Sequence, residues 1–121
     1  MHVKEQLAAT FDAYRNEPDV FQQMLELARE GIENHRATIN AACSGNETAV
    51  VEGDALIDAL HRLTNIIAAL RLQTISNRLN AIERTARAGE RDRTCGEWNA
   101  LKDTFDEIER MVRTELESRE S

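Results

Sequence analysis

Three histidines and two cysteines are the residues of this chain best suited to nucleophilic or metal chemistry. An imidazole that is neutral near physiological pH can act as a nucleophile, a general base or a metal ligand. His2 lies at the terminus, where side chains are seldom held in place. His35 falls in phase with Ile32 and Ile39, which predicts a packed structural histidine on or beside the core face of its helix. His61 is therefore the candidate for chemistry.

His61 stands one residue step, about 100°, away from a regular apolar seam. The seam consists of Leu56, Leu60, Leu63 and Ile67. The residues in line with the histidine are mostly small or polar: Ile57, Asp58, Thr64, Asn65 and Ala68. An imidazole in the middle of such a helix is expected to be accessible to a partner while its backbone is held rigidly.

Apolar residues recur with helical spacing along almost the whole chain, and caps and turns divide the pattern. The sequence predicts helices over residues 3–15, 17–43, 47–70, 73–87 and 94–117, with a tight bend near Arg71 and a frayed C-terminal tail. The second helix is expected to bury one face, made of Val20, Met24, Leu27, Ile32 and Ile39. The last helix is expected to bury Trp98, Leu101, Phe105, Ile108 and Val112. Capping boxes are expected at Ser44–Glu47 and Thr94–Glu97. Helices of these lengths with short connections predict an all-α fold, an antiparallel four-helix bundle with a short additional N-terminal helix, as one domain over residues 1–121.

The composition excludes several classes of protein. The 121 residues carry a net charge of −7, which disfavours binding to the phosphate backbone of nucleic acids. There is no apolar run long enough to cross a membrane, and the charged N-terminal segment does not resemble a signal peptide. Cys43 and Cys95 could form one disulfide, but we expect two free thiols in a reducing cytoplasm.

The segment 61–83 carries a recognisable pattern. It opens with His-Arg-Leu-Thr-Asn, continues with Ile-Ile-Ala-Ala-Leu, bends, and then has Ile75, Leu79, Ile82 and Glu83. This pattern resembles the signature of histidine-containing phosphotransfer (HPt) domains, which begins with the phospho-accepting histidine, any residue and a leucine. The following helix of that signature ends in an apolar residue and a glutamate. The run Val-Phe-Gln-Gln-Met-Leu-Glu-Leu at 20–27 also resembles the helix ahead of the histidine, and the similarity coarsely covers residues 16–115.

Two positions depart from the family pattern. HPt domains usually have lysine three residues after the histidine and glycine four residues after it. This chain has Thr64 and Asn65 at these two positions. A threonine hydroxyl donates one neutral hydrogen bond, whereas lysine also offsets the charge of phosphohistidine. Arg62 or Arg71 could supply that charge. The chain is expected to be an active but atypical module, with a degenerate module that docks partners without phosphotransfer as the alternative.

The resemblance implies a phosphoryl carrier rather than an independent enzyme. His61 would accept a phosphoryl group from an aspartate of a receiver domain, in a response regulator or hybrid sensor kinase, and pass it to another receiver. The receiver would bring Mg²⁺ and the catalytic residues, so no cofactor is expected on this chain. The phosphate neighbourhood and docking surface would comprise Ile57, Asp58, Arg62, Thr64, Asn65 and Ala68. We expect a monomer that binds neither nucleic acid nor membrane.

Other kinds of protein fit parts of the sequence. Asp58 and His61 lie three residues apart on one helix face, as ligands do in carboxylate-bridged di-iron bundles, but no second acid-x-x-histidine pair follows. Cys43, Cys95 and a histidine lack the spacing of a zinc site. A purely structural or adaptor bundle would share every periodicity, and only phosphorylation of His61 would distinguish it.

Overall fold

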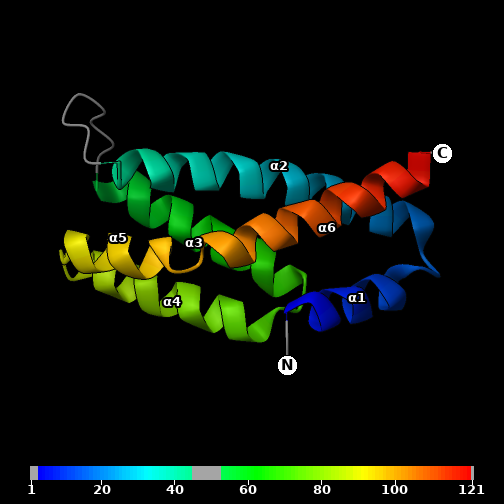
Figure 1. Cartoon of the computed structure of the whole chain (residues 1–121), viewed down its shortest axis with the longest axis horizontal. Coiled ribbons are helices and arrows are strands. Elements are labelled where there is room, and N and C mark those ends of the chain that lie inside the picture. The colour runs from blue at the N-terminus through cyan, green and yellow to red at the C-terminus, as the bar shows by residue number, and fades with distance from the viewer. Residues whose placement is uncertain (1–2, 45–52, 121) are drawn as a thin grey trace.

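The computed structural model describes residues 3–44 and 53–120, and every regular element within these two ranges is an α-helix. The helices are α1 (Val3–Tyr14), α2 (Pro18–Ala42), α3 (Gly53–Ala69), α4 (Gln73–Arg87), α5 (Arg91–Asn99) and α6 (Lys102–Glu120). Figure 1 shows α3 lying between α2 and α4, and neighbouring helices pack against one another: α2 on α3, α3 on α4, α4 on α5, and α6 on α2 and α1. The predicted all-α class is confirmed.

The first four predicted helices match the structure closely where it is described. The predictions 3–15 and 17–43 correspond to α1 and α2, and 73–87 coincides with α4. Pro18 is the first residue of α2, as its rigid φ favours, but no side chain caps the start of that helix. The predicted start of the helix at 47 and the Ser44–Glu47 capping box involve residues 45–52, which lie outside the described residues.

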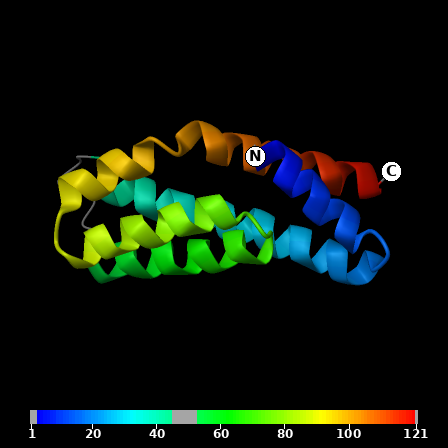
Figure 2. The ribbon, with the colours of Figure 1, turned by 90° about the horizontal axis from the view of Figure 1, so that it is seen from below.

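The predicted last helix, 94–117, is wrong at its start and in its continuity. It begins at Arg91 and consists of two helices, which meet at a bend (Figure 2). At the bend the Leu101 amide donates to the Trp98 carbonyl, a tighter bond than the α-helical one, and both side chains remain buried. Thr94 is not a cap, because it lies inside α5 and its hydroxyl donates to the carbonyl of Glu90 at 2.8 Å.

The expected fraying of the C-terminal tail is also wrong, because α6 continues to Glu120. Leu116 is buried in the core. Arg119 holds the last turn against the start of α2: its guanidinium donates to the Gln22 side chain and to the carbonyl of Pro18, and it lies 4.8 Å from the centre of the Phe21 ring. The last turn thus has tertiary partners that the sequence pattern does not reveal.

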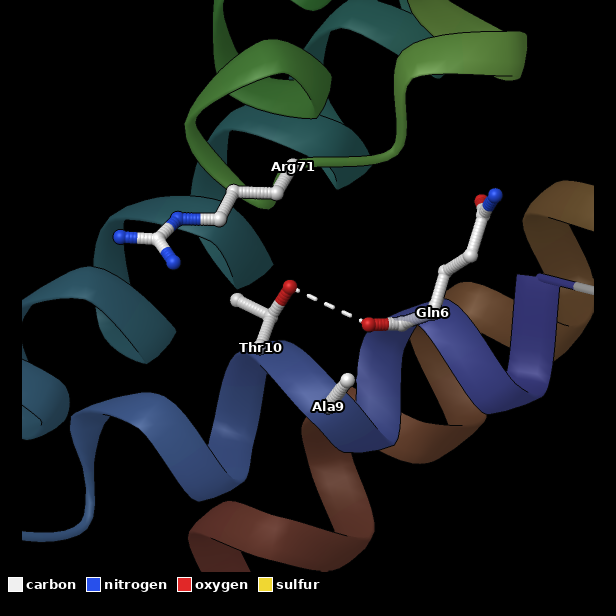
Figure 3. Close-up of a pocket in the computed structure, with 4 residues that line it drawn as sticks. All are labelled: Gln6, Ala9, Thr10 and Arg71. Atoms are coloured by element: carbon white, nitrogen blue, oxygen red, sulfur yellow. Dashed lines mark hydrogen bonds between the residues drawn. The ribbon is translucent and has the colours of Figure 1, made fainter.

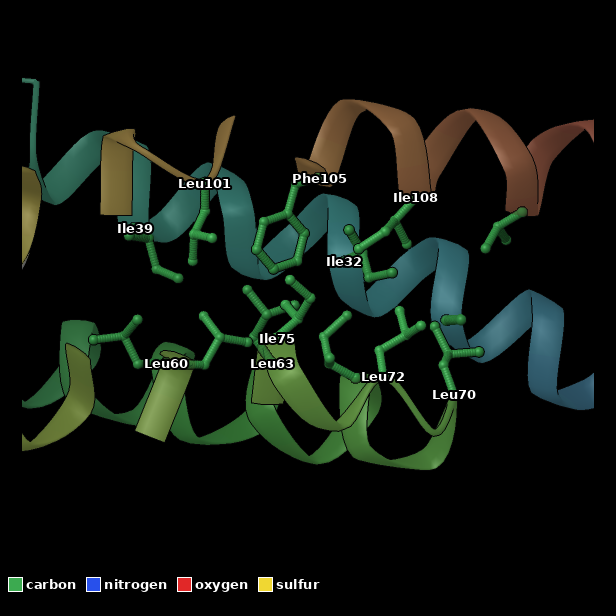
Figure 4. Packing of buried hydrophobic residues seen from close by; sticks show 14 of the residues in the cluster. Ile32, Ile39, Leu60, Leu63, Leu70, Leu72, Ile75, Leu101, Phe105 and Ile108 are labelled. Atoms are coloured by element: carbon green, nitrogen blue, oxygen red, sulfur yellow. The ribbon is translucent and has the colours of Figure 1, made fainter. Parts of the chain in front are cut away.

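The core contains the seams predicted for α3, α4 and the last helix. Leu60, Leu63 and Ile67 are fully buried, as predicted, and Leu79 of α4 and Phe105 of α6 are buried with them. Figure 4 shows Phe105 and its neighbours facing the leucines and isoleucines of α3 and α4, with side chains of α2 closing the space. Because α3 contributes one continuous stripe to this core, its opposite face is available to solvent.

The apolar face predicted for the first half of α2 is displaced by one residue. The side chains expected to be buried include Val20 and Leu27, which are 49% and 68% exposed, whereas Phe21, Leu25 and Ala28 are buried. Both sets have helical spacing, so the sequence alone does not distinguish them. The later predictions on the same helix, Ile32 and Ile39, are correct.

The turn between α3 and α4 is a Schellman motif, the bend predicted near Arg71. The Leu72 amide donates to the Ile67 carbonyl at 3.2 Å and the Arg71 amide to the Ala68 carbonyl at 2.9 Å. Arg71 has a φ of 62°, a left-handed conformation usually taken by glycine. Gly89 occupies the corresponding position after α4, with a φ of 79°. The turn at Arg71 folds α4 back on α3 as one helical hairpin, and the turn at Gly89 leads from α4 into α5.

A disulfide between Cys43 and Cys95 joins the end of α2 to α5, so the prediction of two free thiols is wrong. Two further contacts join the same helices: the Trp98 indole donates to the Asn40 side chain at 2.8 Å, and Arg91 donates to the carbonyl of Ala42. Two cysteines 52 residues apart can be paired only by the tertiary fold, and here their Cα atoms lie 5.5 Å apart.

Candidate functional site

His61 lies near the middle of α3 on its exposed face. Its side chain is 57% exposed, while the adjacent Leu60 is fully buried. The prediction of an accessible imidazole beside a buried seam is therefore confirmed. Because α3 packs on α2 and α4 along that seam, the backbone that carries the imidazole is fixed by the core.

The imidazole is held from the neighbouring helix. Nδ1 of His61 lies 3.2 Å from Oε1 of Glu83 on α4, and Oε2 of the same carboxylate accepts a hydrogen bond from Nε of Arg87 at 2.9 Å. A carboxylate beside Nδ1 favours the neutral tautomer that carries its proton there. In that tautomer the lone pair of Nε2 is available, and no described residue forms a hydrogen bond with Nε2.

An ion pair flanks the imidazole on its own helix. Arg62 donates through Nε to Asp58 at 2.8 Å, and both side chains are more than half exposed. Each charge offsets the other, so Arg62 is not a free cation beside His61. Of the remaining residues predicted around the histidine, Asn65 and Ala68 are exposed and Ile57 is half-buried, which leaves small or polar groups along this face.

Thr64 departs from its expected place beside the phosphate. It is 6% exposed, and its hydroxyl donates to the carbonyl of Leu60 one turn earlier at 2.7 Å. This back-bond uses the single donor of the side chain. The position that is lysine in the HPt signature thus contributes no accessible donor here.

His35 is half-buried on α2, consistent with the packed histidine that the sequence predicts. Burial lowers its pKa, the positive charge of Arg62 lowers it further, and the negative charge of Asp58 opposes the shift. His35 thus faces the ion pair of α3 from the α2 side, while Glu83 approaches His61 from the α4 side.

Glu83 and Arg87 are the site residues that the sequence did not predict. Glu83 belongs to the motif 61–83, but the sequence pattern assigns it no role there. Its partner lies 22 residues earlier on the preceding helix, so only the return of α4 along α3 brings the two together. Arg87 then follows from the i, i+4 spacing on α4, which is a common ion-pair spacing.

Arg71, the other candidate for a phosphate-balancing charge, lies elsewhere. Its guanidinium is 5.5 Å from the centre of the Tyr14 ring and borders an open hollow between α1 and the α3–α4 turn. Figure 3 shows Gln6, Ala9 and Thr10 of α1 facing it. The Thr10 hydroxyl lies 2.7 Å from the Leu70 carbonyl and anchors α1 to the turn. Arg71 therefore contributes to the attachment of α1.

Within ranges 3–44 and 53–120, no three histidine, cysteine or acidic side chains come close enough to hold a metal ion. None of the helices described there is both long and apolar enough to span a membrane.

Comparisons with protein-family models, curated proteins and solved structures found no match to this chain.

Proposed function

We propose that this chain is a histidine phosphotransfer module of a two-component phosphorelay, with His61 as the phosphoryl carrier. The observation that carries the proposal is the contact of 3.2 Å between Nδ1 of an exposed mid-helix histidine and Glu83. This contact favours the tautomer whose Nε2 is nucleophilic, and the rigid core keeps that atom on the surface.

The proposed reaction needs little from this chain beyond the imidazole and its carboxylate. The lone pair of Nε2 attacks the phosphorus of an aspartyl phosphate on a receiver domain. As the N–P bond forms, the P–O bond to the aspartate breaks and its electrons stay on the aspartate carboxylate. The ring now carries a positive charge with its proton still on Nδ1, and the Glu83 carboxylate stabilises that charge. The reverse sequence passes the phosphoryl group to a second receiver.

The arrangement of the helices suits this role. We take α2, α3, α4 and the α5–α6 pair as the antiparallel four-helix bundle of an HPt module, with α1 as the additional N-terminal helix. His61 then projects from the side of the bundle, at mid-length of α3, with more than half of its side chain exposed to an approaching receiver. Ile57, Asn65 and Ala68 would form the contact surface, and the Asn65 amide could donate to a phosphoryl oxygen. The receiver is expected to supply Mg²⁺, and the module to act as a monomer.

The alternative is a degenerate module that binds receivers without accepting phosphate. The buried Thr64 favours it, because no cation occupies the place of the usual lysine and the threonine hydroxyl is already bonded within the helix. Under this alternative the same surface would dock a receiver, and Glu83 would only hold a surface histidine in place.

The decisive experiment is incubation with phosphorylated receiver domains, followed by measurement of acid-labile, alkali-stable phosphate on this chain. His61→Gln should abolish labelling, yet change the free energy of unfolding by no more than about 0.5 kcal/mol, because the side chain is exposed. His35→Gln is the matched control, since it removes a histidine from the facing helix and should leave labelling intact. Binding of receivers without labelling of the unaltered chain would establish the docking alternative.

A further inference from the structure

Glu83 is shared between two donors that compete for its negative charge. Its carboxylate is only 13% exposed, and it lies between the His61 ring at 3.2 Å and the Arg87 guanidinium at 2.9 Å. Arg87 itself is 58% exposed and has no other polar partner among the described residues. The imidazole of His61 contacts the carboxylate of Glu83, and that carboxylate contacts the guanidinium of Arg87. The charge of Arg87 therefore affects how strongly the carboxylate interacts with the imidazole.

The fate of a phosphoryl group on Nε2 depends on the proton on Nδ1. When the N–P bond breaks, its electron pair returns to Nε2. If Nδ1 carries a proton, the leaving group is a neutral imidazole; without that proton it is an imidazolate, which leaves poorly. Phosphoryl transfer to an aspartate and loss to water therefore both need the protonated ring. In hydrolysis the attacking water gives its proton to the solvent and inorganic phosphate is released.

We propose that Arg87 is a positioning residue that sets the lifetime of the phosphoryl group on His61, by limiting how strongly Glu83 holds the Nδ1 proton. This inference rests on the proposed function. A carboxylate that is already bonded to a guanidinium attracts a second proton less strongly than a free one. Arg87 also fixes the carboxylate so that Oε1 faces the ring. The positive charge of Arg87 would thus make the Nδ1 proton of phosphorylated His61 easier to lose, and so prolong the phosphorylated state. The hydrogen bond of Arg87 would keep the Glu83 carboxylate in position beside the ring.

Other charges near the histidine do not substitute for Arg87. On α3, Asp58 and Arg62 are paired and largely cancel each other. On α2, His35 faces that pair. On α4, Arg84 follows Glu83 in the sequence and is exposed, but it has no hydrogen bond or ion pair with the carboxylate. Arg84 therefore offers a matched control: the same side chain and the same charge, three residues from Arg87, without the contact.

The test compares Arg87→Gln, Arg87→Lys and Arg84→Gln after loading with phosphoramidate, a small donor that phosphorylates histidine without a receiver. The rate at which label is lost is measured across a pH series. A unit charge about 7 Å away in water-like surroundings shifts such a profile by about half a pH unit, or about threefold in rate at fixed pH. Arg87→Gln should shift the profile to higher pH by this amount and shorten the lifetime. Arg87→Lys should restore most of the lifetime, and Arg84→Gln should have less than half the effect.

Equal shifts for Arg87→Gln and Arg84→Gln would overturn the inference, because they would reflect net charge alone. An unchanged profile in Arg87→Gln would overturn it as well. A nitrogen NMR spectrum of the His61 ring supplies a second readout: Arg87→Gln should retain the tautomer protonated on Nδ1, whereas Glu83→Ala, which removes the acceptor, should lose it. Failure of the proposed function is recognised separately, since receivers would then leave no phosphate on the unaltered chain even though phosphoramidate loads it and the variants differ.

Discussion

Reduction of the Cys43–Cys95 disulfide should lower the stability of the fold by about 4 kcal/mol. The bond closes a loop with a sequence separation of 52 residues. For a loop of this length, the chain-entropy relation gives a loss of about 14 cal/mol/K from the unfolded ensemble, which is about 4 kcal/mol at room temperature. Residual structure in the reduced unfolded chain would decrease this figure. The folded state should persist after reduction, because Trp98 and Arg91 still join α5 to α2.

Urea denaturation of the oxidised and reduced protein measures this difference. A Cys43→Ala/Cys95→Ala variant is the control: it should match the reduced protein and respond to no reductant. Unfolding free energies that agree within about 1 kcal/mol, or two thiols that react with an alkylating reagent in the native oxidised sample, would refute this reasoning. The same alkylation in intact cells tests the predicted cytoplasmic location, where most disulfides are reduced.

Three further outcomes are expected. Glu83→Gln should slow phosphorylation of His61 roughly fivefold in a rate assay, because replacing a charge-assisted hydrogen bond by a neutral one costs about 1 kcal/mol; an unchanged rate would exclude a role for the carboxylate. Because burial lowers the pKa of His35, the unfolded chain takes up that proton at higher pH than the folded one. Stability should therefore fall as the pH drops below the ordinary histidine pKa of about 6.5, and His35→Gln should flatten this part of the urea-measured profile. Arg71→Ala should be about 1 kcal/mol less stable than Arg71→Gly, since both lose the guanidinium but only alanine keeps a Cβ in the left-handed region; equal stabilities would contradict that conformation.

The part of the fold that the sequence predicts well is the part where one apolar stripe has no competitor. In α3 the seam of Leu60, Leu63 and Ile67 has mostly polar or small residues on its other faces, so its burial and the exposure of His61 follow from spacing. In α2 the residues Val20 and Leu27 imitate a second stripe one residue away from the true one. Only the partners across the interface decide which stripe is buried, and these partners are not local in sequence.

The bend between α5 and α6 could not be predicted for a related reason. Trp98, Leu101 and Phe105 have the spacing of one continuous helix, and all three are buried. The break requires only that one amide bonds three residues back instead of four, which leaves the apolar pattern unchanged. Thr94 resembled a cap because a threonine three residues before a glutamate is the usual signal, yet the helix had begun earlier.

The candidate site, like the fold, can be predicted from the sequence only where it depends on residues of a single helix. The histidine and its exposed face follow from one helix, whereas the carboxylate that holds the imidazole lies on another helix, and its role needs the geometry of the turn. Thr64 illustrates the opposite error: its spacing placed it beside His61, but a threonine can bond back to the preceding turn and withdraw from the surface.

The tight turn that joins α3 to α4 has a consequence for the order in which the molecule folds. His61 and Glu83 meet within one helical hairpin, so the chain that must close between them is short and the entropy lost on closure is small. Local contacts of this kind form early, whereas the contacts of α1 with the turn and of α5 with α2 join residues 49 to 60 positions apart. The imidazole and its carboxylate would therefore already be together in the folding transition state, before the rest of the chain closes over the core. Substitutions in the hairpin should then act mainly on the folding rate, and those in α1 mainly on the unfolding rate.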